Sequence, residues 1–331
     1  MIEAPVDLDS LIGGWRLAFE AAQGALAAAS HDLPPDELRM HAQRLTDERA
    51  TAVRLLDALA RERQMKHFLV RLVATSWESK RLLGVPQDTE ACVFNVDGVL
   101  VPSATIHAAA WRETFDAFLA GRIDSTGFPY ASFSVDVDYP RHVHGRTRME
   151  SVREFLASRG IALPDGSPDD PPGTETVAGL ANAKNRALRA HLETHAVHAF
   201  EGARLYLELA HDARVRCAVV SGSTNTRMLL DRARLDSLID DCVDGNTMRS
   251  ESLRRKPAPD MLLAACRHLD VQPERTVVFE TTPDGVDAGR AGGFEAVVAV
   301  DRDGEARTLR SHGADLVVSD LGELLERQLG G

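Results

Sequence analysis

The sequence predicts an α/β protein built on a doubly wound, Rossmann-like parallel sheet. Apolar and β-branched runs end at glycine or polar residues at 91–100, 215–220, 275–279, 296–300 and 316–318. Such runs are typical of strands that are covered on both faces. Helical segments lie between them, and this alternation indicates a parallel sheet with right-handed crossovers.

The composition of the chain is that of an ordinary globular protein. Its 331 residues are enough for two or three domains, and 44% of them are hydrophobic. The formal net charge of −12 disfavours a nucleic-acid partner, because a phosphate backbone attracts basic residues. No apolar run is long enough to span a membrane, the N-terminus lacks a signal-peptide pattern, and the four cysteines lack metal-site spacing. We therefore expect a cytoplasmic protein with reduced thiols and with no nucleic-acid or membrane partner.

Residues 1–83 are predicted to form an N-terminal helical extension without a catalytic motif. Apolar residues recur there at helical spacing, most clearly at 38–59 and 68–77. Two alternatives stay open, because an apolar face must be covered by something. The extension either packs as a helical hairpin on the main domain, or it serves as a homodimer or partner-docking module.

The remainder is predicted to divide into a core and an inserted helical cap. Residues 84–105 and 200–331 would form the Rossmann-like core, and residues 106–199 the cap. Helical patterns in this region cover 104–120, 149–159 and 178–195. The stretch 164–173 must be a loop, because it holds four prolines and two glycines.

Polar residues stand where the predicted strands end. Asn95 and Asp97 follow the first strand with one residue between them, Ser221 follows the second, and Glu280 with Thr281 follows the third. Doubly wound folds bind their ligands at this carboxyl edge of the sheet. We expect these residues to share one site.

The order and spacing of these residues over 90–300 resemble the haloacid dehalogenase superfamily. That resemblance implies phosphoryl transfer through an aspartyl-phosphate, with a nucleophile at position 95 and a Mg²⁺ ion that neutralises the transferring group. By the same match, Asp97 is the acid/base, Ser221 the phosphate-binding hydroxyl and Lys256 the lysine of the third motif.

The resemblance also implies a set of substrate-binding residues. Gly222 and Ser223 would offer backbone amides at a helix N-terminus, and Asn225 belongs to the same predicted set.

Within the superfamily, the cap segments resemble those of the β-phosphoglucomutase-like group. His107 follows Asn95 by twelve residues, and the segment 144–148 ends at Arg148. The resemblance implies that Arg148 clamps the distal phosphate of a sugar bisphosphate, a task that suits a bidentate guanidinium. Lys184 with Asn185 resembles a second substrate-facing pair. For each of these residues, a surface or packing role is the alternative.

Two residues depart from the superfamily pattern. Asn95 stands where a nucleophilic aspartate is expected, and an uncharged amide attacks phosphorus very poorly. Thr281 stands where a metal-binding aspartate is expected. Mg²⁺ prefers carboxylate oxygens, and only Asp97 and Glu280 remain as carboxylates for such a site. Some superfamily variants use a later aspartate as a ligand, but Asp284 is off by one position from that place in the sequence. The sequence thus leaves a Mg²⁺ site open but incomplete.

Three functions follow as alternatives. The first is a catalytically impaired protein that binds a phosphorylated sugar or acts as a regulator or scaffold. The second is an active Mg²⁺-dependent sugar-phosphate phosphatase or phosphoglucomutase, if Asn95 is engineered or bypassed. The third is an interaction protein that works through its N-terminal helices. Two separate losses, at Asn95 and Thr281, favour natural degeneration and the first alternative, because losing a nucleophile removes about 10⁴ to 10⁶ in rate.

Overall fold

The structure, a computed structural model, describes residues 79–144 and 146–329. The predicted extension at 1–83 therefore falls almost entirely outside the described residues, and its two alternatives stay predictions. Among the described helices, none combines the length and apolar character needed to cross a membrane.

Within the described residues, six parallel strands form one sheet in the order β3-β2-β1-β4-β5-β6. The strands are β1 (Ala91–Asn95), β2 (Arg216–Val220), β3 (Asp241–Val243), β4 (Thr276–Glu280), β5 (Ala296–Val300) and β6 (Leu316–Val318). β1 pairs with β2 on one side and with β4 on the other. The strand order reverses there, so the carboxyl end of β1 lies at the switch point where such folds bind ligands. The predicted doubly wound fold is confirmed.

One strand was missed by the sequence analysis. β3 has only three residues, of which Cys242 and Val243 are buried. A strand this short at the sheet edge shows no recognisable apolar run, so sequence pattern could not find it.

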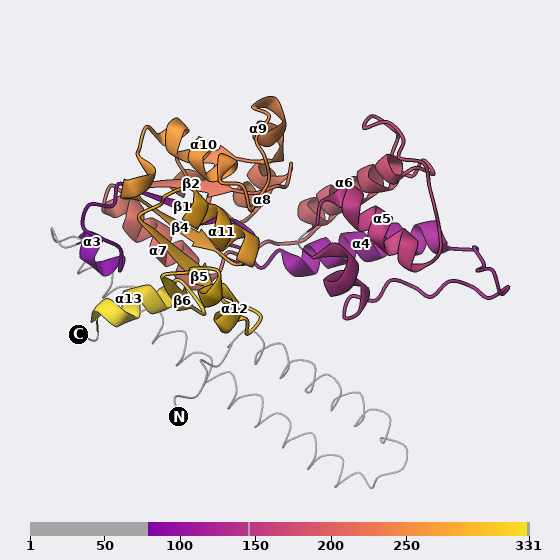
Figure 1. The fold of residues 1–331 in the computed structure, drawn as a ribbon, viewed down its shortest axis with the longest axis horizontal. Coiled ribbons are helices and arrows are strands. Elements are labelled where there is room, and N and C mark those ends of the chain that lie inside the picture. Colours follow the sequence, from indigo (N-terminus) through magenta and orange to yellow (C-terminus); the bar gives the residue numbers. More distant parts are fainter. Residues whose placement is uncertain (1–78, 145, 330–331) are drawn as a thin grey trace, which may run out of the picture. The chain divides into compact units, whose positions relative to one another are not determined.

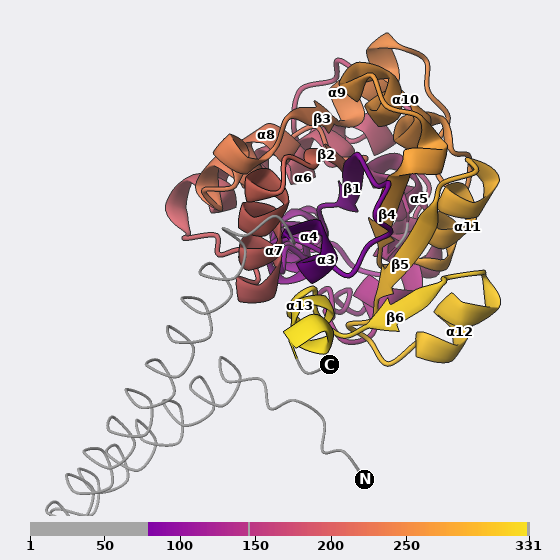
Figure 2. The same ribbon diagram turned by 90° about the vertical axis from the view of Figure 1, so that its left-hand side faces the viewer.

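Helices cover both faces of the sheet (Figures 1 and 2). They are α3 (Ser79–Leu82), α7 (Glu201–Asp212), α8 (Thr226–Arg232), α9 (Gly245–Ser250), α10 (Asp260–Leu269), α11 (Pro283–Ala291), α12 (Ala306–Ser311) and α13 (Gly322–Leu329). Figure 2 shows α10 and α11 on the side of the sheet opposite α7. Both faces of the strands are therefore apolar, which explains why apolar and polar residues do not alternate along β1 and β4.

Aromatic rings fill the core beneath the end of β1. Phe94 stacks on Phe279 of β4 at a centroid distance of 4.6 Å, and it meets Tyr206 of α7 edge-on at 6.0 Å. The Tyr206 hydroxyl donates a hydrogen bond to the main-chain oxygen of Leu83 at 2.9 Å. All these side chains are fully buried, so a closely packed aromatic layer lies beneath the carboxyl end of β1.

Replacing Phe94 with alanine is expected to destabilise the protein by about 3–5 kcal/mol, because it empties the centre of this layer. Phe128→Ala is the matched control, since that ring is 68% exposed and its loss should cost less than about 0.5 kcal/mol. Urea unfolding of the full chain measures both. Equal midpoints for the two variants would contradict this view of the core.

The segment between β1 and α7 holds the helices of the predicted cap, and it is called the cap below (Figure 1). It contains α4 (Ala104–Leu119), the π-helix η2 (Tyr139–Val143), α5 (Arg148–Ser158) and α6 (Val177–Thr194). The three α-helices match the predicted helical patterns to within one residue at each end, whereas η2 was not predicted. The cap has its own aromatic core, in which Phe115 stacks on Phe155 at 3.9 Å. No helix or strand is assigned at 164–173, as expected for a proline-rich loop.

Candidate active site

Asn95 ends β1 and ties together the two loops at the switch point. Its side-chain Nδ2 donates to the main-chain oxygen of Asp97 at 2.9 Å and to Thr281 Oγ1 at 3.2 Å. The Thr281 hydroxyl also donates to the Asp97 main-chain oxygen at 3.3 Å. Gly98 permits this closeness, because it has a φ of +78° and a Cβ there would press on the Thr281 methyl group at 3.0 Å. The two departures from the superfamily pattern are thus neighbours that bond to each other.

The carboxylate of Asp97 accepts a hydrogen bond from the hydroxyl of Ser103. Ser103 is buried at the N-cap of α4, yet its side chain makes no capping bond to that helix. The hydroxyl donates to the Asp97 carboxylate instead. Ser103 was not among the predicted site residues, although its position at the start of a predicted helix six residues after Asp97 was a usable signal.

Lys256 and Glu280 form an ion pair beside Asn95. The Lys256 Nζ contacts the Glu280 carboxylate and also donates to Asn95 Oδ1 at 3.3 Å. Glu280 is fully buried, and among the described residues its carboxylate has no hydrogen-bond partner apart from this ion pair. A Cβ at Gly285 of α11 would overlap that carboxylate, so glycine provides the room. Lys256 therefore neutralises a carboxylate that would otherwise be a buried lone charge.

The loop after β2 holds the remaining core residues of the predicted site. Ser221 is buried, and its Oγ accepts from the Ser223 amide at 3.2 Å. The Ser223 hydroxyl in turn accepts from the Asn225 amide at 3.2 Å. Asn225 Nδ2 donates to Asn185 Oδ1 of α6 at 2.8 Å, which joins this loop to the cap. Gly222 is exposed at the turn between them.

The cap contributes a basic cluster of His107, Arg148 and Lys184. The Lys184 Nζ lies 3.2 Å from His107 Nδ1 and 5.4 Å from the centre of the Trp111 ring. Arg148 Nη1 donates to the Ala181 main-chain oxygen at 3.5 Å. The structure thus brings all three predicted cap residues together.

Electrostatic effects connect this cluster to the core. Burial and the charge of Arg148 lower the pKa of Lys184 to about 7, while the charge of Asp97 acts against them. Burial, then the charge of Lys184, lowers the pKa of His107 to about 4, and here too Asp97 opposes the change. Burial also lowers the pKa of Arg148, and the charge of Arg249 on α9 adds to this. Lys184 and His107 are therefore near enough to Asp97 for its charge to act on both.

Tyr139 of η2 also faces Asp97, although no sequence signal indicated it. Burial raises the pKa of its hydroxyl to about 12, and the negative charge of Asp97 acts in the same direction. Asp284, in contrast, is exposed on the first turn of α11, while its neighbour Gly285 is the residue that faces Glu280. The structure therefore gives no support to Asp284 as a substitute ligand.

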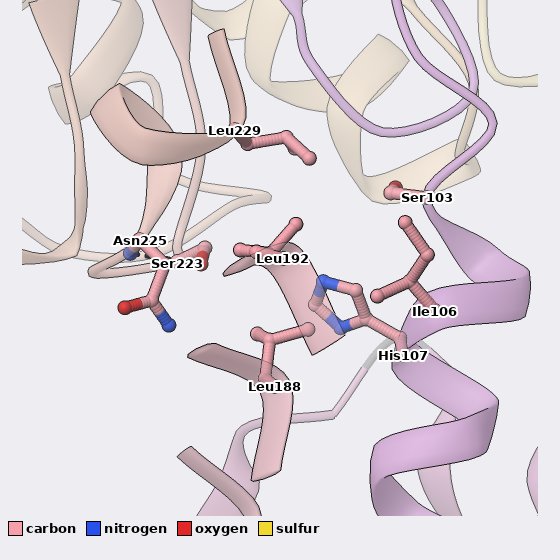
Figure 3. A pocket seen from close by; sticks show the side chains of 8 residues that line it. All are labelled: Ser103, Ile106, His107, Leu188, Leu192, Ser223, Asn225 and Leu229. Atoms are coloured by element: carbon pink, nitrogen blue, oxygen red, sulfur yellow. Dashed lines mark hydrogen bonds between the residues drawn. The ribbon is translucent and has the colours of Figure 1, made fainter. Parts of the chain in front are cut away.

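A small pocket opens where the core and cap helices meet (Figure 3). Polar groups and aliphatic side chains share its lining, which consists of Ser103, Ile106, His107, Leu188, Leu192, Ser223, Asn225 and Leu229. Figure 3 shows the His107 imidazole between Ile106 of α4 and the leucines of α6. His107 thus lies between this pocket and Lys184.

Comparison with known proteins decides the family. A family model described as haloacid dehalogenase-like hydrolase matches residues 89–293. The chain belongs to the haloacid dehalogenase-like hydrolases. It is 47% identical over 248 residues to a β-phosphoglucomutase from Mycobacterium bovis, an alignment that covers 74% of this chain and 95% of that protein.

Two further comparisons are more distant, one with a sequence relative and one with a solved structure. A phosphorylated carbohydrates phosphatase from Thermotoga maritima is 26% identical over 219 residues, covering 64% of this chain and 85% of that protein. The crystal structure of CbbY from Rhodobacter sphaeroides in complex with phosphate superposes with a TM-score of 0.54 and 24% identity, covering 71% of this chain and 96% of that one. The likeness to CbbY supports the fold alone.

Members of this superfamily typically use Mg²⁺, but the groups present here do not fit that ion. The Asp97 main-chain oxygen already accepts from Asn95 and Thr281, and the Glu280 carboxylate is paired with Lys256. Within 79–144 and 146–329, no three His, Cys, Asp or Glu side chains lie close enough to hold a metal ion. Mg²⁺ needs several anionic or neutral oxygens in near-octahedral order, and this donor set lacks two carboxylates.

Proposed function

We propose that this β-phosphoglucomutase-like protein binds a phosphorylated sugar and does not turn it over. The observation that carries the proposal is the hydrogen bonding of the Asn95 side chain. Its amide nitrogen is a donor to Asp97 and Thr281, and its oxygen accepts from Lys256. An amide fixed in this way offers phosphorus no nucleophile.

The groups that would hold a phosphate need no nucleophile and are present. Ser221 and Lys256 lie at the carboxyl ends of the strands. Arg148 and Lys184 lie on the cap, where the charge of Asp97 acts on Lys184. Charge-assisted hydrogen bonds to such groups are the strong kind, so an anionic ester has sufficient partners here. A protein that binds without reacting suits a regulatory or scaffolding role.

Calorimetric titration with β-glucose 1-phosphate, beside a phosphate-release assay, tests the proposal. We expect saturable binding and no release above the buffer control. Ser221→Ala should weaken binding by about tenfold, since a hydrogen bond to a charged group contributes about 1.5–3 kcal/mol. Ser250→Ala is the matched control, because that serine is exposed on α9 and its hydroxyl donates to the main-chain oxygen of Thr247 in the same helix. The absence of saturable binding would remove the proposal.

The second candidate is an active phosphoglucomutase, and the 47% identical relative of that name favours it. An active enzyme would convert β-glucose 1-phosphate to glucose 6-phosphate with Mg²⁺ present. Conversion by the unmodified protein at rates usual for phosphomutases would establish this candidate and overturn the first.

A further inference from the structure

Lys184 is a buried amine that has no ion pair with any described carboxylate. Its side chain is 2% exposed, and the only hydrogen bond of Nζ to a described residue goes to His107 Nδ1 at 3.2 Å. The imidazole itself titrates well below neutral pH, so at pH 7 it accepts from the ammonium and adds no charge. Trp111 lies on another side of the amine, and its ring face offers only a weak attraction. A buried charge with so little compensation is costly unless a ligand supplies the missing anion.

The charged and titratable groups around Lys184 come from each neighbouring element. His107 faces it from α4, Arg148 from α5 and Asp97 from the loop after β1. α8, which also packs against α6, bears Asn225 at its N-cap, and that side chain bonds to Asn185 beside Lys184. One acid therefore faces one fixed cation, one titratable amine and one neutral imidazole. The four groups together have a net charge of zero when Lys184 is neutral and of +1 when it is protonated.

We propose that Lys184 takes up one proton from solvent when a doubly charged oxyanion binds between core and cap, which makes this protein selective for dianionic ligands. This inference rests on the proposed function and adds the charge state that the site recognises. The proton goes to the lone pair of Nζ, and no bond to the anion forms or breaks.

The direction of the pH dependence follows from the pKa of Lys184, which is about 7 in the free protein. A bound dianion favours the charged amine and raises that pKa. At about pH 7 roughly half of the molecules must gain a proton on binding, and at about pH 8.5 nearly all must. Affinity should fall by up to about tenfold per pH unit above neutrality, because each binding event then requires a scarcer proton.

Sulfate is the appropriate probe, because it remains doubly charged at every pH used and any proton taken up must reach the protein. Calorimetric titrations in Tris and in HEPES, whose ionisation enthalpies differ, give the number of protons bound per sulfate. We expect roughly 0.5 at about pH 7 and close to 1 at about pH 8.5. Titration with β-glucose 1-phosphate confirms in parallel that the site is competent.

Three variants assign the proton. Lys184→Met removes the amine at similar volume and should lose proton uptake together with at least tenfold in affinity. Lys184→Arg carries a permanent charge, so it should bind sulfate with no proton uptake and with little pH dependence. Arg186→Met removes one positive charge from the exposed side of the same helix and should keep the proton uptake of the unmodified protein.

Each outcome decides a separate question. Sulfate binding without proton uptake, or uptake that persists in Lys184→Arg, would overturn the inference and leave the proposed function intact. Failure of both sulfate and β-glucose 1-phosphate to bind would instead remove the proposed function. Uptake that vanishes in Lys184→Arg and persists in Arg186→Met supports the inference.

Discussion

The double variant Asn95→Asp, Thr281→Asp is expected to hydrolyse a phosphate ester at least about 100-fold faster than the unmodified protein when Mg²⁺ is present. The nucleophile alone accounts for about 10⁴ to 10⁶ in rate in enzymes of known mechanism, and its partner groups are already in place. Asp97 remains as acid/base, and Lys256 and Ser221 remain at the strand ends. Partial recovery is the realistic expectation, because loop positions adapted to an amide will not be ideal for a carboxylate.

The same double variant should also acquire a dependence on Mg²⁺ for stability. The side chains of Asn95 and Thr281 are 3.2 Å apart, so two carboxylates there would repel each other unless a cation lies between them. We expect a lower melting temperature in EDTA and a gain of several degrees with millimolar Mg²⁺. The unmodified protein should show no such gain.

The control for both readouts is a set of single and triple variants. Asn95→Asp alone and Thr281→Asp alone should recover less than the double variant, and adding Asp97→Asn to the double variant should abolish the gain in activity. If the unmodified protein already turns over as fast as the double variant, the impaired-site interpretation is wrong.

Lys256→Met is expected to destabilise the protein by about 3–5 kcal/mol, the range measured when one partner of a buried ion pair is removed. Glu280 is fully buried, and Lys256, with its side chain 19% exposed, is its counter-ion. Removing the ammonium leaves the carboxylate unpaired in the wall of the site. The variant should also lose anion binding, because the same amine faces the proposed phosphate position.

Guanidinium unfolding of the full chain measures this cost. The double variant Lys256→Met, Glu280→Leu should recover most of the lost stability, since it removes both charges and keeps the apolar packing around β4. It should not recover anion binding. If Lys256→Met alone unfolds at the same midpoint as the unmodified protein, Glu280 is not held by this ion pair.

The sequence by itself determined the fold class and most of the elements. Uninterrupted β-branched runs such as 296–300 predict strands buried on both faces, and the structure places β5 there. It also determined the two chemical changes at the switch point, because the identities of Asn95 and Thr281 are read directly from the chain. The limits of the core and cap domains and the place of the extension stay predictions.

Only the tertiary structure decided how those residues interact. Asn95 and Thr281 are 186 residues apart in sequence, and their hydrogen bond exists because β1 and β4 are neighbours in the sheet. The hydrogen bond from Ser103 to Asp97 is formed across a loop, although the position of Ser103 was a usable signal in the sequence. The effect of Asp97 on Tyr139 acts between segments far apart in the chain, and no local pattern encodes it. The pKa of Lys184 likewise follows from its burial and from the charges of Arg148 and Asp97. Residue type limits which chemistry is available, but desolvation and long-range proximity decide which groups carry charge, and these arise only when the chain is packed.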